Sequence, residues 1–127
     1  MPKALTHFPR KEIVESTRAA GARVERRVAW HYRLRGYRIV ARNARAGGYE
    51  IDLIARRGQR LVVCEVKSKA GEEFGDSAEM VDEEKQRRLR RAADAWLAAH
   101  PDFAALDVRF DVVAVSSQRI VRIADAF

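Results

Sequence analysis

The stretch Gly47–Lys69, GGYEIDLIARRGQRLVVCEVKSK, decides the fold that the rest of the chain has to fit. Apolar and polar residues alternate along it, which predicts two strands whose side chains point to opposite faces. A tight turn is expected at Arg57-Gly58, where glycine adopts a positive φ at little cost. The register of such a two-residue turn pairs Ile54 with Leu61, Asp52 with Val63, and Glu50 with Glu65.

Charged side chains gather on one face of this predicted hairpin, at the end away from the turn. They are Glu50, Asp52, Glu65 and Lys67. Like charges opposite each other destabilise a strand pair, since two unit charges ~4 Å apart repel by about 4 kcal/mol at an effective dielectric of 20. A divalent cation between the carboxylates would reverse the sign of this interaction. The solvated face of an antiparallel sheet has the same alternation, so the hairpin alone leaves both interpretations open.

The second strand begins with an apolar run, which favours the metal interpretation. Residues 61–64, LVVC, are apolar toward both faces, as in a buried central strand. Glu65 and Lys67 therefore emerge at the edge of the core, where a charge needs a partner. Cys64 is the one cysteine of the chain, so no internal disulfide can form, and its apolar surroundings indicate a core residue and not a nucleophile.

The composition is that of one globular domain with a basic surface. A chain of 127 residues with 47% hydrophobic and 34% charged residues is long enough for a single core. The net charge of +7 favours an anionic partner, nucleic acid first and an acidic membrane surface second, although plain solubility explains it equally well. No signal peptide and no apolar run of ~18 residues is present, so we expect a cytoplasmic protein that does not enter the membrane.

Two helices are expected, one on each side of the hairpin in sequence. A basic arm over residues 1–16 leads into a single domain over residues 17–127. The first helix is expected over Thr17–Arg35, with Thr17 as its cap and Gly36 as its stop. Its apolar stripe consists of Val28, Ala29 and Tyr32. Glu25 lies on or beside this stripe, where a salt bridge with a neighbouring arginine explains it as well as a functional role does.

The second helix is expected over Val81–Ala99 and ends before Pro101. Its buried face consists of Leu89, Ala92, Ala93 and Trp96, with Lys85 one turn earlier on the same stripe. Its exposed face carries Arg87, Arg88, Arg90 and Arg91. This cluster is the best candidate in the chain for contacts with phosphate groups, and a merely solvated face is the alternative.

The remaining segments complete an α/β pattern. Further strands are expected at Tyr37–Asn43, Leu106–Val115 and Gln118–Ile123, with a turn at Ala44–Gly48 and a loop at Ala70–Ala78 that contains Phe74-Gly75. The order helix, three strands, helix, strand, strand predicts an α/β domain with a mixed sheet flanked by helices.

The candidate site joins Asp52 with the run Glu65-Val66-Lys67. Mg²⁺ usually takes one or two carboxylates plus waters, and Asp52 and Glu65 can supply these two, with the Val66 carbonyl as a third ligand. Lys67 would lie on the same face, where an amine can orient or deprotonate a water or stabilise a charged phosphate. This arrangement suits hydrolysis of a phosphodiester. The sequence has no P-loop, no dinucleotide-binding glycine turn and no G-x-S-x-G motif.

These residues give the chain a resemblance to a known family. It resembles the YraN family of small bacterial proteins, which belongs to the PD-(D/E)xK nuclease superfamily together with archaeal Holliday-junction resolvases. The matching landmarks are Glu25, Gly36-Tyr37, Asn43, Arg45, the run from Glu50 to Ile54, Val63 to Lys67, Phe74-Gly75, Lys85, and Phe110 to Val113. Glu50 is a secondary candidate, because Tyr49 is inserted before it relative to the family pattern.

The resemblance implies a restriction-endonuclease-like core, ordered α-β-β-β-α-β, and a metal-dependent nuclease. Asp52 and Glu65 would bind Mg²⁺ or Mn²⁺, Lys67 would be the catalytic lysine, and Glu25 an auxiliary acid. DNA, branched or damaged, is expected before RNA, and a homodimer stays open because junction resolvases are dimers. The residues expected to contact nucleic acid are Arg45, Lys69, Lys85, Arg87, Arg88 and Arg91. A non-catalytic nucleic-acid-binding module and a protein-interaction domain are the alternatives.

Overall fold

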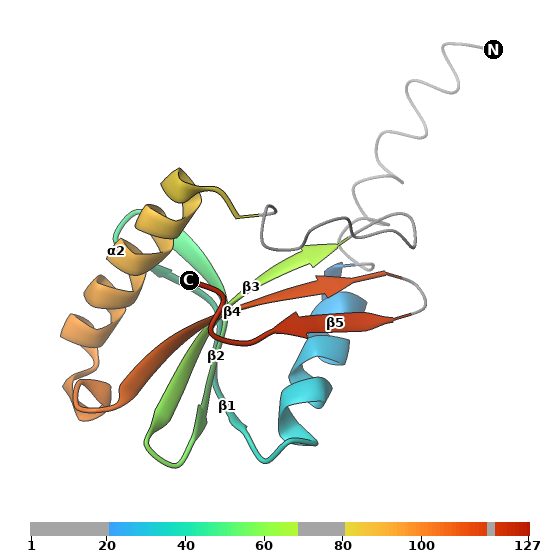
Figure 1. Ribbon diagram of the computed structural model, residues 1–127. Helices are drawn as coiled ribbons and strands as arrows, with labels where there is room; N and C mark the ends of the chain where they lie inside the picture. The colour runs from blue at the N-terminus through green and yellow to red at the C-terminus, as the bar shows by residue number, and fades with distance from the viewer. Residues whose placement is uncertain (1–20, 69–80, 117–118) are drawn as a thin grey trace, which may run out of the picture.

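The computed structural model describes residues 21–68, 81–116 and 119–127, which form an α/β fold around a five-stranded sheet (Figure 1). The strands are β1 (Arg38–Ala46), β2 (Tyr49–Arg57), β3 (Arg60–Ser68), β4 (Asp107–Val115) and β5 (Ile120–Ile123). Helix α2 (Glu83–Ala99) and the short 3-10 helix η2 (Pro101–Phe103) lie between β3 and β4 in sequence. A helix over residues 21–33, called the N-terminal helix below, precedes β1.

Some expectations fall outside the described residues. These are the arm over residues 1–16, the Thr17 cap, Lys69, and the loop Ala70–Ala78 with Phe74-Gly75. Within the described residues, no helix has both the length and the apolar character needed to cross a bilayer.

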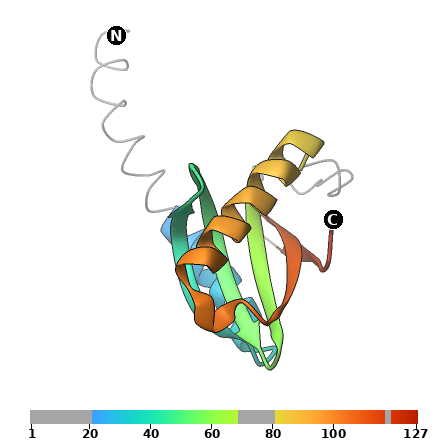
Figure 2. The same cartoon turned by 90° about the vertical axis from the view of Figure 1, so that its left-hand side faces the viewer.

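The sheet is mixed and has helices on both faces, as expected. Its strand order is β1-β2-β3-β4-β5, in which only β3 and β4 run parallel. Helix α2 covers one face and the N-terminal helix covers the other (Figures 1 and 2). Each face has its own hydrophobic cluster: Leu89 and Trp96 pack with Ile54 and Val63 on the α2 side. Residues of the N-terminal helix pack with Leu53 and Val62 on the other side. The predicted fold class is therefore confirmed.

Helix α2 follows its sequence pattern closely. Its buried residues are Leu89, Ala92, Ala93 and Trp96, the four that helical spacing predicts. The helix begins at Glu83 and not at Val81, because Asp82 acts as the N-cap and its carboxylate accepts a hydrogen bond from the Lys85 backbone N–H at 2.8 Å. Burial of this one face attaches the helix to the sheet and leaves the arginine-rich face exposed.

The N-terminal helix stops at Gly36, as predicted. Gly36 has φ +87°, and its backbone N–H donates to the Arg33 carbonyl while the Tyr37 N–H donates to the Tyr32 carbonyl. This pair of bonds is a Schellman motif, and the rings of Tyr32 and Tyr37 make its accompanying contact at a centroid distance of 5.3 Å. The motif turns the chain directly into β1.

The register predicted for the β2–β3 hairpin is wrong by two residues. Arg57 pairs with Arg60 and Ile54 with Val63, so the turn residues are Gly58 and Gln59. Gly58 has φ +61°, and a glycine at the first of two turn positions is typical of type II′ turns. Asp52 therefore does not face Val63. The predicted Ala44–Gly48 turn is also too long, because β1 continues to Ala46 and only Gly47-Gly48 turns, both with positive φ.

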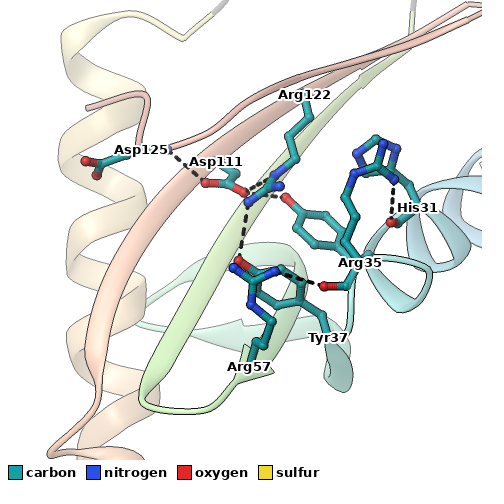
Figure 3. A network of polar contacts seen from close by, with 8 residues as sticks. His31, Arg35, Tyr37, Arg57, Asp111, Arg122 and Asp125 are labelled. Atoms are coloured by element: carbon teal, nitrogen blue, oxygen red, sulfur yellow. Dashed lines mark hydrogen bonds and ion pairs between the residues drawn. The ribbon is translucent and has the colours of Figure 1, made fainter.

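A buried polar network connects the N-terminal helix to the last two strands (Figure 3). The Asp111 carboxylate on β4 accepts hydrogen bonds from the Tyr32 hydroxyl at 2.6 Å and from Arg122 Nε at 2.8 Å. Its other oxygen accepts the backbone N–H of Asp125 at 3.0 Å. Burial, followed by interactions with Cys64 and Asp111, raises the pKa of Tyr32, so the hydroxyl stays a donor. The sequence pattern places Asp111 on the face opposite Phe110 but does not reveal this network.

Candidate active site

The candidate site begins where the β2–β3 ladder stops. The paired residues end at Leu53 and Cys64, and the next residues along the strands are Asp52 and Glu65. Here the Asp52 side chain replaces the ladder, because its Oδ2 accepts the Val66 backbone N–H at 2.8 Å. A side chain thus satisfies a donor that a neighbouring strand would otherwise satisfy.

A local irregularity in β1 and β2 positions Asp52. Asn43 on β1 has φ +50°, and the pairing passes from Arg42–Leu53 to Ala44–Ile51 around it. On β2, Ile51 packs with the cluster on the α2 side whereas Leu53 packs with the other, although residues two apart on a regular strand share a face. The strand therefore changes face at Asp52, which an alternating sequence pattern does not predict.

The carboxyl groups of Asp52 and Glu65 are close enough to interact, just beyond the last pair of the β2–β3 ladder. Burial raises the pKa of Asp52 to about 7, the hydrogen bond from Val66 opposes that rise, and the charge of Glu65 and a hydrogen bond with it add to it. Two acids held together in this way favour one bound proton or one cation between them. The sequence predicts this neighbourhood although its register is wrong.

Two lysines neutralise the buried acid. Glu65 is only 5% exposed, and its Oε2 lies 3.5 Å from the ammonium nitrogen of Lys67 on β3 and 3.5 Å from that of Lys85 on α2. Burial and a hydrogen bond with Lys85 lower the pKa of Lys67, while that hydrogen bond raises the pKa of Lys85. Lys67 is therefore the amine that loses its proton more readily.

Glu25 approaches the site from the N-terminal helix. Its Oε2 accepts a hydrogen bond of 3.3 Å from the side-chain amide of Asn43. Glu25 and Asp52 line the same cavity of about 260 Å³, whose other lining residues are Gly21, Val24, Val66 and Ser68. The structure thus brings Glu25 of the N-terminal helix toward Asp52, Glu65 and Lys67 of the β2–β3 hairpin.

The residues expected to contact nucleic acid are distributed differently. Arg45 pairs with the exposed Glu50 across β1 and β2, and the charge of Glu50 contributes to the raised pKa of Asp52. Arg87 and Arg91 are exposed on α2, whereas Arg88 forms an ion pair of 2.8 Å with Glu84. Lys85 lies at Glu65 and so belongs to the candidate site itself.

A Mg²⁺ or Mn²⁺ ion is compatible with these donors. Mg²⁺ keeps several waters and needs one or two carboxylates, which the neighbouring acids Asp52 and Glu65 could supply. In the described part of the chain, no three His, Cys, Asp or Glu side chains form a group suited to a metal ion. The protein would therefore contribute two carboxylates, with waters and main-chain oxygen completing the shell.

Two neighbours of the site were not predicted. The side-chain amide of Asn43 donates a hydrogen bond to Glu25. Asparagine tolerates a positive φ better than most residues, so its presence in the strand was the one sequence signal for the irregular backbone at this position. Tyr49, at the start of β2, lies near Glu65 and Lys85: burial, then the charge of Glu65, raises its pKa, and the charge of Lys85 lowers it.

Comparison with known proteins decides the family. The model of the uncharacterised protein family UPF0102 matches residues 24–115. The chain belongs to the UPF0102 family. It is 45% identical over 100 residues to a UPF0102 protein of Bartonella bacilliformis, a match that covers 79% of this chain and 80% of that relative. It is 48% identical over 108 residues to a UPF0102 protein of Parvibaculum lavamentivorans, covering 84% and 80%.

The UPF0102 match confirms the resemblance to the YraN-type family. Residues 24–115 span the whole candidate site, from Glu25 on the N-terminal helix to Lys85 on α2. The site is thus part of the region that defines the family model, and not an extension peculiar to this chain.

Proposed function

We propose that this UPF0102 protein is a divalent-metal-dependent nuclease that hydrolyses phosphodiester bonds in DNA, with branched or damaged DNA as substrate. One observation carries the proposal: Asp52 and Glu65 are neighbouring acids just beyond the last pair of the β2–β3 ladder, with the amine of Lys67 3.5 Å from Glu65. A carboxyl with a raised pKa that borders a cavity and has a specific charged neighbour, as Asp52 does, is typical of functional sites.

The proposed roles follow from the contacts. Asp52 and Glu65 hold the ion, with the Val66 carbonyl as a third protein ligand. When bound, Mg²⁺ or Mn²⁺ lowers the pKa of a coordinated water and offsets charge on a phosphoryl oxygen. Lys67 has a lowered pKa, which suits an amine that accepts a proton from the attacking water or orients it. Glu25 borders the same cavity as an auxiliary acid.

Lys85 has a role inside the site in this proposal. It keeps a positive charge next to Glu65 and thereby favours loss of a proton from Lys67. Exposed arginines of α2, Arg87 and Arg91, would hold the flanking phosphates together with Arg45 and Lys69.

Cleavage assays test the proposal. The purified protein is incubated with end-labelled linear, nicked and four-way branched DNA in Mg²⁺, Mn²⁺ or EDTA. We expect metal-dependent cleavage that Asp52→Asn and Glu65→Gln each reduce by about a hundredfold or more, because each substitution removes a charged ligand. Lys67→Ala is expected to reduce it by about a hundredfold through loss of the proton acceptor.

Glu84→Gln on α2 is the matched control. It removes a carboxylate from an exposed ion pair, so cleavage should change by less than about twofold. Absence of cleavage with every substrate and metal, or equal activity of Asp52→Asn and wild type, would contradict the proposal.

One observation favours a second candidate, a nucleic-acid-binding module without catalysis. Glu65 already has two lysine partners, so its charge is neutralised without a metal. Under this alternative, calorimetric titration with Mg²⁺ or Mn²⁺ gives no binding heat, while DNA binding persists in Asp52→Asn and weakens with salt.

A further inference from the structure

The outward face of the N-terminal helix carries a basic hollow around an exposed tryptophan. The hollow has a volume of about 500 Å³, and its lining includes Arg23, Arg26, Arg27, Trp30, Leu34 and Ile120. Trp30 is 56% exposed and Leu34 is 77% exposed, and they are the two large hydrophobic residues that the described part of the chain leaves on its surface. Solvent exposure of an indole ring needs an explanation, because such rings normally bury most of their area.

This face is separate from the candidate active site. Trp30 follows Glu25 by five residues, which places it about 140° around the helix and ~7.5 Å further along it. Glu25 points toward the cavity shared with Asp52, so the hollow lies on the opposite side of the same helix. The core contacts of Val28 and Tyr32 hold the helix in this orientation.

The charge around Trp30 has one sign. None of the residues that line the hollow in the described structure is acidic, and four arginines are among them. The guanidinium of Arg33 lies 5.6 Å from the centre of the Trp30 ring. His31 also lines the hollow. Burial, then the positive charges of Arg35 and Arg122, which Figure 3 shows together with His31, lowers its pKa. The face therefore suits an anionic ligand that also offers a flat apolar surface.

We propose that this face binds single-stranded nucleic acid, with an unpaired base stacked on Trp30 and adjacent phosphates paired with Arg23, Arg26 and Arg33. Proteins bind single strands by combining a positively charged groove with aromatic side chains on which bases stack. In a duplex, neighbouring base pairs cover the faces of each base, so Trp30 discriminates for unpaired segments.

Other occupants fit less well. A second copy of this chain would bring one arginine cluster against another, which like charges disfavour. A helix that lies in a membrane surface separates its apolar and basic residues onto different faces, whereas here Trp30 and Leu34 are interspersed with the arginines and the apolar face is in the core.

This inference rests on the proposed function and names its substrate class more closely. A nuclease with the catalytic cavity on one side of the N-terminal helix and a single-strand contact on the other would select DNA in which an unpaired strand adjoins a duplex. Flaps, forks and gapped duplexes have this property.

The test measures binding in EDTA, so that no cleavage takes place. A fluorescein-labelled oligothymidylate of about 15 nucleotides and a duplex of equal length are titrated with wild type, Trp30→Ala and Leu34→Ala, and binding is read by polarisation. We expect Trp30→Ala to weaken single-strand binding by about tenfold and duplex binding by less than about twofold, from the loss of stacking on one base. Leu34→Ala, which removes an even more exposed side chain that has no ring, should change both affinities by less than about twofold.

Two further readouts use the same ligand. Unlabelled oligothymidylate should quench the tryptophan fluorescence of wild type but not of Trp30→Ala, whose remaining Trp96 is 5% exposed. Arg26→Ala should reduce the salt dependence of single-strand binding by about 0.7 in the log–log slope, whereas Arg38→Ala, a charge-matched change on β1, should leave it unchanged.

Specific outcomes overturn the inference. The first is that Trp30→Ala and wild type bind single strands with equal affinity. The second is that the protein binds phosphatidylglycerol vesicles and Trp30→Ala abolishes this binding while DNA binding is unchanged. The third is that the protein sediments as a dimer and Trp30→Ala dissociates it without changing DNA binding. The assay requires neither metal nor cleavage, so the two failures are distinguishable. Trp30-dependent single-strand binding by a wild-type protein that cleaves no substrate would contradict the nuclease alone, whereas cleavage by a wild-type protein whose single-strand affinity does not depend on Trp30 would contradict this inference alone.

Discussion

At the scale of single residues, Asp52 is the side chain whose properties depend most on its surroundings. Burial and the nearby Glu65 disfavour the charged form of this carboxyl, whereas the hydrogen bond from the Val66 N–H favours it. The balance raises its pKa to about 7. An acid in this state destabilises the folded protein at neutral pH and is available to a cation.

A pH-dependent effect on stability follows. The folded pKa of about 7 exceeds the reference value of 3.8, so the folded state loses stability as the pH rises from about 4 to about 7. Asp52→Asn removes this loss and should raise the free energy of unfolding at pH ~8 by about 2 kcal/mol, with little effect at pH ~4. Urea denaturation in EDTA at both pH values measures the difference.

Asp94→Asn is the control for this measurement, because Asp94 is exposed on α2 and should change stability equally little at both pH values. A destabilising effect of Asp52→Asn at pH ~8 would show that the folded protein stabilises the charged form of Asp52, which would contradict a raised pKa.

At the scale of the element, helices were predicted better than strand pairing. The four buried residues of α2 follow from helical periodicity, and Gly36 ends the N-terminal helix where glycine predicts an end. The predicted β2–β3 register was wrong because a glycine suits either position of a two-residue turn. Only the pairing of the whole strands shows that Gly58 is the first turn residue and not the second. Local propensity specifies an element, whereas register depends on its neighbours.

The role of Gly36 in ending the N-terminal helix can be tested by comparing Gly36 with Gly21, a glycine on the helix itself. Gly36→Ala puts a side chain at φ +87° and should cost about 1 kcal/mol of stability. Gly21→Ala adds a methyl group on the N-terminal helix, where no described atom other than the adjoining residues and the helix backbone lies within 4 Å, and should be neutral or stabilising by up to ~1 kcal/mol. Thermal and urea unfolding measure both, and equal effects of the two variants would contradict the role assigned to the Schellman motif.

At the scale of the whole molecule, the Asp111 network joins parts that no single element connects. Tyr32 belongs to the N-terminal helix, Asp111 to β4 and Arg122 to β5, and all three meet at one carboxylate (Figure 3). The network holds the helix that carries both Glu25 and Trp30 against the sheet. Its integrity therefore matters for the candidate site as well as for stability.

Asp111→Ala should destabilise the protein by about 3–5 kcal/mol, because it leaves the guanidinium of Arg122 and the Tyr32 hydroxyl without their buried partner. Asp107→Ala on the same strand is the control, since its ion pair with Arg109 is largely exposed and should contribute less than about 1 kcal/mol. Urea denaturation followed by circular dichroism compares them. Similar losses for both variants would show that the buried network adds no more than a surface pair.

Local periodicity and side-chain chemistry are properties of neighbouring residues, so they were sufficient to predict the α/β class, the buried faces of the two helices, and that Asp52, Glu65 and Lys67 would be neighbours. Three features could not be read from the sequence: the Asp52 side chain replaces part of a strand ladder, Lys85 reaches Glu65 from α2, and Asp111 is a buried junction. These features depend on strand register and on helices packing across the sheet, and such contacts between distant residues are set by the energy of the whole fold.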